Sequence, residues 1–128
     1  TQSREEINVL VAEDNPINQK LIKIVLEKLG LHVTLAANGQ EAYEECVNGK
    51  YELIFMDIQM PVMGGVESTH QILAYEKENE KAHIPIIALT ANALPGDKEK
   101  YISEGMDDYA TKPLDVKEIE KLIKQYCK

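Results

Sequence analysis

Several kinds of residue are scarce in this chain, and each scarcity excludes a class of protein. Lysine and arginine number 14 against 22 aspartate and glutamate residues, giving a net charge of −8 that disfavours direct binding to the phosphate backbone of nucleic acids. No apolar run approaches the roughly 20 residues that a membrane-spanning helix requires. The first six residues are polar, whereas a secretory signal is apolar in its centre. We therefore expect a cytosolic domain that contacts neither nucleic acid nor membrane directly.

Cysteine and nucleotide-binding motifs are scarce or missing as well. Cys46 and Cys127 form no CxxC or metal-spaced pair, and a structural disulfide is not expected in a reducing compartment. We interpret both as free thiols that are packed or partly exposed. The patterns GxGxxG and GxxxxGK[ST] are absent, which argues against a nucleotide-binding domain. The chain begins with Thr1 rather than methionine, which indicates part of a longer protein, although processing of the initiator would have the same result.

The residues that are present suffice for one folded domain. The chain has 128 residues, of which 44% are hydrophobic, and this length supports one hydrophobic core but not two. We predict a single domain over residues 1–128, with its core between about residues 7 and 126, and we expect it to be monomeric.

Short apolar runs alternate with segments of helical periodicity along the chain. The runs predict strands at residues 7–12, 32–36, 53–57, 85–90 and 107–110. The periodic segments predict helices at residues 16–29, 40–47, 66–81, 97–103 and 116–126. Five strands alternating with five helices indicate right-handed crossovers and a doubly wound α/β fold with a parallel five-stranded sheet. The flavodoxin-like strand order 2-1-3-4-5 is the arrangement we predict.

The first helix carries clear signals at both ends. Asn15 is a good N-cap, Pro16 suits the first helical position and Gly30 suits the residue after the helix. Apolar residues recur between them at helical spacing, namely Ile17, Leu21, Ile24, Val25 and Leu29. We expect Ile17 and Leu21 to make core contacts. Near the end of the third helix, the charged run 76–81 predicts a solvated helix end.

Carboxylates follow the first and third predicted strands. Glu13 and Asp14 come directly after the first, and Asp57 ends the third. In the predicted strand order these two strand ends flank the crevice where ligands bind in such sheets. Three neighbouring carboxylates repel one another, and a divalent cation removes the conflict. Oxygen ligands without histidine or cysteine favour Mg²⁺, with Mn²⁺ as an alternative.

The fourth and fifth predicted strands also end in polar side chains. Thr90 offers a hydroxyl and Lys112 an ammonium, and both groups suit the oxygens of a phosphoryl group. The set predicts phosphoryl transfer to a nucleophilic Asp57, assisted by the cation, Thr90 and Lys112. A cis peptide bond between Lys112 and Pro113 would turn the lysine toward the pocket.

Four stretches together resemble the receiver domain of two-component response regulators, and most closely the receivers of hybrid sensor histidine kinases. The stretches are VLVAEDNPINQK at residues 9–20, IFMDIQMPVM at 54–63, IIALTANA at 86–93 and GMDDYATKP at 105–113. The resemblance implies a cytoplasmic phosphorelay module, either free or in the cytosolic part of a membrane-anchored sensor kinase. It implies that a histidine kinase or a histidine-containing phosphotransfer domain donates phosphate to Asp57.

The resemblance also assigns roles to individual residues. Glu13 and Asp14 form the acidic pocket, and the backbone carbonyl of Gln59 completes the Mg²⁺ ligands with Asp57. The domain would catalyse its own phosphorylation and slow dephosphorylation.

Further implied roles concern switching, phosphate lifetime and docking. Thr90 and Tyr109 are the switch pair, while Gln59 and Asn92 tune the lifetime of the phosphate. The start of the first helix is where phosphotransfer helices dock. One departure from the family pattern is Gly64, where an aspartate is usual, and it removes a cap from the third helix.

Other interpretations compete with these. A haloacid-dehalogenase-type phosphatase also uses a strand-end aspartate, but it needs a second aspartate where this chain has Gln59. A degenerate receiver that acts only as an interaction scaffold is the main alternative function. Intact Glu13, Asp14, Asp57, Thr90 and Lys112 argue against it. Considered one by one, Glu13 and Asp14 could also be solvated turn residues, Thr90 a strand-end hydroxyl and Tyr109 a half-packed side chain that does not switch. We interpret His32, His70 and His83 as surface histidines.

Overall fold

The structure is a computed structural model that describes residues 7–58, 60–90, 94–112 and 115–127. Its strands are β1 (Asn8–Ala12), β2 (His32–Ala36), β3 (Leu53–Asp57), β4 (Ile86–Thr90) and β5 (Asp108–Thr111). Its helices are α1 (Pro16–Lys28), α2 (Gly39–Asn48), α3 (Gly65–Glu78), α4 (Asp97–Ser103) and α5 (Val116–Tyr126). The predicted order of elements is confirmed, with some ends shifted by up to three residues.

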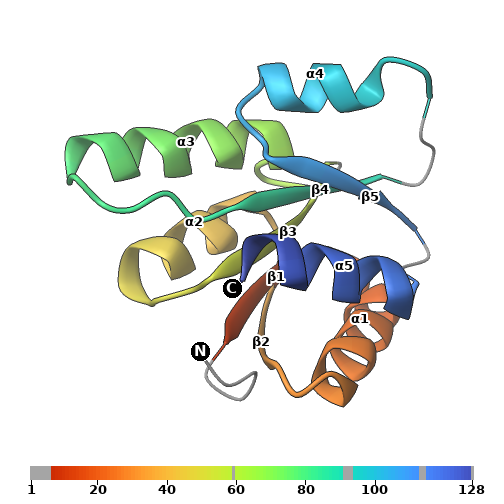
Figure 1. Ribbon diagram of the computed structural model, residues 1–128. Coiled ribbons are helices and arrows are strands. Elements are labelled where there is room, and N and C mark those ends of the chain that lie inside the picture. Colours follow the sequence, from red (N-terminus) through yellow and green to blue (C-terminus); the bar gives the residue numbers. More distant parts are fainter. Residues whose placement is uncertain (1–6, 59, 91–93, 113–114, 128) are drawn as a thin grey trace.

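The five strands form one parallel sheet in the order β2-β1-β3-β4-β5 (Figure 1). β1 pairs with both β2 and β3, so that Ala12 lies level with Ala36 on one side and with Met56 on the other. The predicted flavodoxin-like topology is therefore confirmed. Because all strands run the same way, their carboxyl ends meet at one edge of the sheet.

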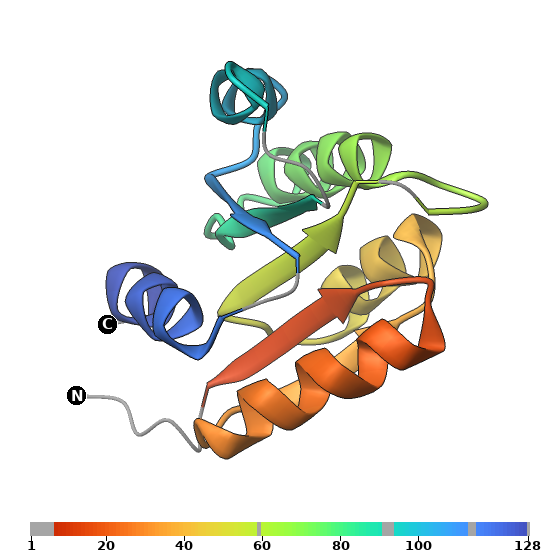
Figure 2. The ribbon, with the colours of Figure 1, turned by 90° about the vertical axis from the view of Figure 1, so that its right-hand side faces the viewer.

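Helices cover both faces of the sheet, with α1 and α5 on one face and α2, α3 and α4 on the other (Figure 2). Alternate residues of each central strand point to opposite faces. The α1–α5 face buries Val9, Val11, Leu53, Phe55, Ile87 and Leu89 against Ile22, Leu26, Ile119, Leu122 and Ile123. The other face buries Leu10, Ala12, Ile54, Met56, Ile86 and Ala88 against Ala42, Cys46, Ile72 and Tyr101.

Helix α1 begins and ends where the sequence predicts. The side chain of Asn15 accepts hydrogen bonds from the backbone N–H of Ile17 at 2.9 Å and of Asn18 at 3.2 Å. Pro16 occupies the first helical position, where a missing N–H has no consequence. Gly30 follows the helix with φ of 86°, a conformation that favours glycine.

The expectation that Ile17 and Leu21 contact the core is wrong. Ile17 is 71% exposed and Leu21 56% exposed, whereas Ile22 and Leu26 are the buried residues of α1. At 100° per residue, Ile17, Leu21 and Ile24 share one stripe of the helix, and Ile22 and Leu26 share another more than a quarter-turn away. Helix α1 is thus apolar on two faces, and only one of them meets the sheet.

The loop between β3 and α3 is held against α2. The N–H of Gly39 donates to the carbonyl of Met63 at 2.9 Å, and the Ser68 hydroxyl donates to the carbonyl of Gly39 at 2.8 Å. A Cβ on Gly39 would overlap the Met63 carbonyl, and one on Gly65 would overlap the carbonyl of Asp57. Both glycines are therefore required by close packing of the main chain.

The N-cap of α3 confirms the expected loss of a capping group. Gly64 occupies this position and provides no side-chain hydrogen bond to the helix. Its φ of −74° and ψ of 170° are extended values that other residues also adopt. The absence of a cap therefore follows from the residue type and not from the backbone conformation.

Sequence reasoning was also wrong about the start of the charged run 76–81. Residues 77–81 are exposed as predicted, but Glu76 is only 7% exposed and lies among polar partners. Its contacts come from residues later in the chain, which helical periodicity cannot reveal.

Candidate active site at the carboxyl ends of the strands

The carboxylates predicted to meet at the edge of the sheet do so. Because β1 and β3 are adjacent and parallel, Glu13 and Asp14 leave β1 beside Asp57 at the end of β3. One carboxylate oxygen from each of the three residues lies within 4.8 Å of the other two. Glu13 and Asp57 are buried, at 1% and 6% exposure, while Asp14 is exposed. The cluster therefore has a buried floor and one solvent-facing member.

Lys112 reaches the buried part of this cluster. Its ammonium nitrogen lies 2.7 Å from Oε2 of Glu13 and 3.0 Å from Oδ2 of Asp57. Its backbone N–H donates to the carbonyl of Thr90 at 2.9 Å, which fixes the lysine beside the end of β4. The residue that follows β5 thus brings a positive charge between two carboxylates.

The three charged groups shift one another's pKa values in different directions. Burial and the hydrogen bond with Glu13 raise the pKa of Asp57 to about 6, although Lys112 opposes this. Burial alone would raise the pKa of Glu13, but hydrogen bonds from Lys112, Asp57 and Asn18 outweigh it and lower the value. Burial alone would lower the pKa of Lys112, but its two carboxylate partners raise it. Asp57 is therefore the group that is held in an unfavourable charged state at neutral pH.

Two amide side chains from α1 hold Glu13 in place. Nδ2 of Asn18 donates to Oε1 of Glu13 at 3.0 Å, and Nε2 of Gln19 donates to the backbone carbonyl of Glu13. With Lys112 on Oε2, both oxygens of the buried carboxylate are hydrogen-bonded. The sequence analysis did not assign this role to Asn18 or Gln19. The sequence feature that pointed to it was an amide side chain five or six residues after Glu13.

The donor set fits a hard divalent cation. Three carboxylates converge without a histidine or cysteine among them, and all three line one pocket. Magnesium prefers oxygen ligands and retains several waters, which suits a site that has one exposed carboxylate. The predicted fourth ligand, the carbonyl of Gln59, lies outside the described residues, as do Asn92 and the Lys112–Pro113 bond.

A pocket of about 470 Å³ surrounds the cluster. Its wall includes Thr90, which ends β4, and Asp97, Lys100 and Tyr101 from α4. The structure thus brings together Glu13, Asp14, Asp57, Thr90 and Lys112, all of which the sequence singled out. Tyr109 is partly buried and packs against the core cluster on the α2–α3–α4 face.

The histidines lie away from this pocket, as expected, but two of them have carboxylate partners. His70 on α3 contacts Glu104 at 2.9 Å on the surface. His83 contacts both Glu76 and Asp107, at 2.9 and 2.8 Å. These contacts join segments far apart in sequence, and no pattern in the chain predicts them.

Comparison with known proteins shows which family the chain is similar to. The family model for the response regulator receiver domain matches residues 9–124 of this chain. Hybrid signal transduction histidine kinase I of Dictyostelium discoideum is 51% identical over 126 residues, covering 94% of this chain and 7% of that protein. The sensor protein GacS of Pseudomonas syringae pv. syringae is 36% identical over 115 residues, covering 90% of this chain and 13% of that protein. The chain thus spans a small part of these curated relatives.

Two solved structures resemble the chain over nearly its whole length. The first, with a TM-score of 0.89 and 39% identity, is a co-crystal structure of the Saccharomyces cerevisiae histidine phosphotransfer protein Ypd1 with the receiver domain of its downstream response regulator Ssk1. The match covers 98% of this chain and 91% of that one. The second is the receiver domain of sensor histidine kinase PA1611 of Pseudomonas aeruginosa PAO1 with a magnesium ion in its active-site cleft. Its TM-score is 0.83 at 40% identity, covering 94% of this chain and 96% of that one.

None of the helices in the described part of the chain combines the length and the apolar character needed to cross a bilayer.

Proposed function

Because the chain belongs to the response regulator receiver domain family, we propose that it accepts a phosphoryl group on Asp57 from a phosphohistidine and relays a signal. The observation that carries the proposal is the contact of Lys112 with Asp57 at 3.0 Å inside a cluster of three carboxylates. We further propose that residues 1–128 are a single receiver domain, with its core at about 7–126, in the cytosolic part of a longer hybrid histidine kinase.

The proposed transfer is a displacement at phosphorus. A carboxylate oxygen of Asp57 forms the new P–O bond while the P–N bond to the donor imidazole breaks and its electron pair returns to the ring nitrogen. Charge on the peripheral phosphoryl oxygens has to be balanced as the group passes between the two. The ammonium of Lys112 and the hydroxyl of Thr90, which line the same pocket, balance part of it.

Glu13, Asp14 and Asp57 would hold Mg²⁺ at this site, joined by the carbonyl of Gln59. A bound ion would supply positive charge that offsets the repulsion of the carboxylates and would bind an oxygen of the phosphoryl group, while Asp57 faces the phosphorus. Glu13 is already fixed by Lys112 and by Asn18, which makes it a preorganised part of the site. Mn²⁺ has the same preference for oxygen ligands and would substitute.

We propose that Thr90 and Tyr109 respond to the new phosphate. The dianionic group on Asp57 would attract the Thr90 hydroxyl, and Tyr109 would turn into the space that is vacated. Tyr109 is partly buried on β5 and lies one strand away from Thr90. The turn would change the face formed by α4, β5 and α5, so that a local charge biases a two-state element.

The exposed apolar stripe of α1, formed by Ile17, Leu21 and Ile24, is the proposed docking surface for the phosphodonor. These residues are 71%, 56% and 43% exposed and begin directly after the acidic residues of the site. A helix of a histidine-containing phosphotransfer domain can pack on such a stripe. The Ssk1 receiver, 39% identical to this chain, has been crystallised with a phosphotransfer protein, which supports a partner of this class.

Phosphorylation by a small donor tests the proposal without a partner protein. Incubation with acetyl phosphate and Mg²⁺ should add one phosphate to the chain, detected as an increase in intact mass that is lost on alkaline treatment. Asp57→Asn should remain folded and gain no phosphate. If the wild-type chain neither gains phosphate nor binds BeF₃⁻ in Mg²⁺, the chain is a scaffold and the proposal fails.

A further inference from the structure

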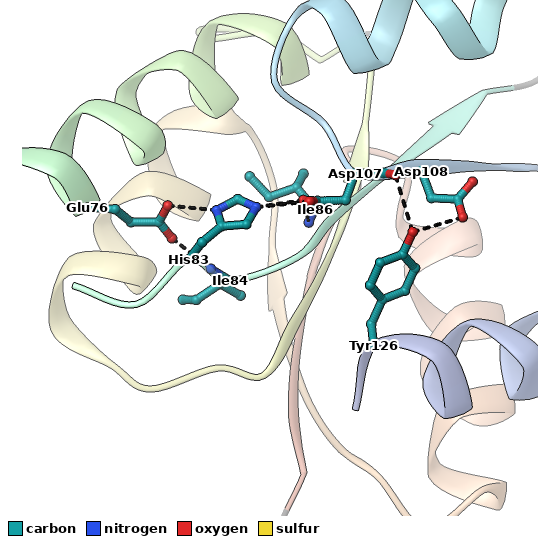
Figure 3. Close-up of polar contacts among 7 residues, drawn as sticks. All are labelled: Glu76, His83, Ile84, Ile86, Asp107, Asp108 and Tyr126. Carbon is teal, nitrogen blue, oxygen red and sulfur yellow. Dashed lines mark hydrogen bonds and ion pairs between the residues drawn. The ribbon is translucent and has the colours of Figure 1, made fainter. Parts of the chain in front are cut away.

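A second cluster of charged side chains lies at the opposite end of the sheet from Asp57, where β4 and β5 begin (Figure 3). His83, in the connection between α3 and β4, lies between Glu76 of α3 and Asp107, which precedes β5. Its Nδ1 is 2.9 Å from Oε1 of Glu76. Its Nε2 is 3.0 Å from Oδ1 and 2.8 Å from Oδ2 of Asp107. One imidazole thus joins three segments of the chain.

This geometry selects the protonation state of the ring. Ionised carboxylates only accept hydrogen bonds, and a neutral imidazole has one N–H and one lone pair. Because both ring nitrogens of His83 face carboxylate oxygens, only the imidazolium satisfies both contacts. Loss of the proton would leave a lone pair facing either Glu76 or Asp107.

Each of the two carboxylates also accepts a hydrogen bond from a backbone N–H. Oε2 of Glu76 accepts the N–H of Ile84 at 2.9 Å, and Oδ2 of Asp107 accepts the N–H of Ile86 at 2.8 Å. The Glu76 side chain is 8% exposed, so it cannot turn to water without disturbing its surroundings. The contacts therefore hold the start of β4 to α3 and to the segment that precedes β5.

Other titratable and charged groups around the cluster lie on α2, on α5 and in the α3–β4 connection, and Lys50, Tyr51 and Glu52 before β3 line the same pocket as Glu76. Cys46 of α2 faces Glu76, and burial with that neighbouring charge raises its pKa to about 12. Tyr126 of α5 donates to the Asp107 carbonyl at 3.2 Å and to Oδ2 of Asp108 at 3.0 Å. Burial and Asp108 raise the pKa of Tyr126 to about 12, so both groups keep their protons at neutral pH. Lys81 lines the same pocket as Glu76 and adds a positive charge.

We propose that His83 is a proton-binding site that ties the starts of β4 and β5 to α3, so that this half of the sheet is held more firmly when the imidazole is charged. The same two strands lead to Thr90 and Lys112 at their other ends, roughly 13 Å away at about 3.3 Å per residue. The tie is independent of the phosphoacceptor chemistry, and it holds whether or not Asp57 takes up phosphate.

The pH dependence has a definite sign. Burial alone would lower the pKa of His83, but the hydrogen bonds and charges of Glu76 and Asp107 outweigh it and raise the value above 6.5. A raised value in the folded state means that the stabilisation is fully present below the pKa of the unfolded chain, about 6.5. It is lost as the pH rises through the folded-state value. Each unit of elevation corresponds to a tenfold preference of the proton for the folded chain.

An NMR titration of the 128-residue chain tests the proposal directly. The ring resonances of His83 should titrate with a midpoint above pH 6.5, and the amide resonances of Ile84 and Ile86 should shift with the same midpoint. Glu76→Gln and Asp107→Asn should each lower that midpoint, because each removes a carboxylate that raises the pKa of His83. Two variants are used because Glu76 is buried and its replacement is the more disruptive of the two.

Glu104→Gln is the matched control, because it removes the carboxylate partner of the exposed His70 and leaves His83 alone. It should not move the midpoint of His83. Urea unfolding at pH 6 and pH 8.5 should show a larger loss of stability in the wild type than in His83→Gln. A His83 midpoint at or below 6.5, or one that Asp107→Asn leaves in place, would overturn the proposal.

Discussion

The proposed role of Asp57 requires an ionised carboxylate, and that charge lowers the stability of the folded chain. Its pKa of about 6 in the folded chain, against an ordinary 3.8, means that burial beside Glu13 disfavours its charge. Because the pKa of Asp57 is higher in the folded chain than in the unfolded chain, its protonated form stabilises the fold. This stabilisation is complete below about pH 3.8 and is lost as the pH rises through 6. At pH 7 and without Mg²⁺, the ionised carboxylate therefore lowers the free energy of unfolding by up to about 3 kcal/mol.

Asp57→Asn should remove this penalty. We expect the variant to be about 1 to 3 kcal/mol more stable than wild type at pH 7 without Mg²⁺, and of equal stability near pH 4. Chemical unfolding at the two pH values measures the difference. A variant that is less stable than wild type at pH 7 would contradict the assigned charge state of Asp57.

Asn18 supports the site from α1. Asn18→Ala removes the donor that lies 3.0 Å from a carboxylate that is 1% exposed, and a buried charged acceptor that loses a partner costs about 1 to 3 kcal/mol. The variant should be destabilised by this amount and should also bind Mg²⁺ more weakly, because Glu13 is no longer held. Calorimetric titration with Mg²⁺ measures the second effect.

Asn15→Ala is the matched control for Asn18→Ala. It removes the N-cap of the same helix and should cost about 1 kcal/mol. Its Mg²⁺ affinity should stay close to that of wild type. If both variants bind Mg²⁺ like wild type, Asn18 has a purely structural role.

At this scale, the sequence predicted the residues whose positions follow from strand ends. Glu13, Asp57 and Lys112 each end or directly follow a predicted strand, and parallel pairing brings such positions to one edge. The contact of Glu76 with His83 was not predictable in this way. It depends on how three irregular segments meet, which no periodicity records.

Helix α1 has an exposed apolar stripe besides its buried face, and the proposed docking of the phosphodonor on this stripe can be tested. Leu21→Gln should slow phosphotransfer from phosphorylated Ypd1, used as a heterologous donor, by about fivefold or more, since an interface anchor contributes more than about 1 kcal/mol. Phosphorylation by acetyl phosphate should be unchanged, because Leu21 is 56% exposed and outside the pocket lining. Rapid-quench assays with the two donors compare the effects.

Ile102→Gln is the control for the α1 surface, since Ile102 is a similarly exposed apolar residue on α4. Its transfer rate should match that of the wild type. An equal slowing in both variants, or none in Leu21→Gln, would exclude the exposed stripe of α1 as the docking surface.

Helix α3 lacks a capping side chain, and restoring one should stabilise it. Gly64 has extended backbone angles, and a Cβ there would meet the Ile58 carbonyl at an ordinary 3.4 Å. Gly64→Asp and Gly64→Ser should each raise the free energy of unfolding by about 1 kcal/mol, through the cap and the reduced freedom of the unfolded chain. Thermal unfolding should show a melting temperature about 2 to 4 °C higher.

Gly64→Ala separates the two contributions, because alanine restricts the unfolded chain without capping the helix. It should be less stable than the serine variant. Equal stability of the two would show that α3 gains nothing from a cap.

Helix ends were predictable from the sequence because caps act locally, as Asn15, Pro16 and Gly30 show for α1. The buried face of α1 was not. Two apolar stripes compete for the sheet, and the choice depends on how the neighbouring helix α5 and β2 pack beside it. In the folded chain, the stripe that contains Ile22 and Leu26 is the one that packs in the core.

For the whole molecule, the strand order was predictable because few topologies satisfy alternating strands and helices with right-handed crossovers. The confirmed order β2-β1-β3-β4-β5 then fixes which strand ends are neighbours. The charged cluster at the opposite end of the sheet was not predictable, because it joins segments far apart in the sequence. The proton site at His83 and the acidic pocket lie at opposite ends of β4 and β5, and only coordinates reveal that shared support.

The close packing at Gly39 and Gly65 limits which substitutions the chain tolerates at these two positions. Their missing side chains let the main chain of α2 and α3 press on the carbonyls of Met63 and Asp57. In a library of random variants selected for folding alone, both positions should therefore return as glycine even where Asp57 itself is replaced. The tolerance to mutation beside the Asp57 carboxylate is then set by the close packing of the backbone and not by the function proposed for that carboxylate.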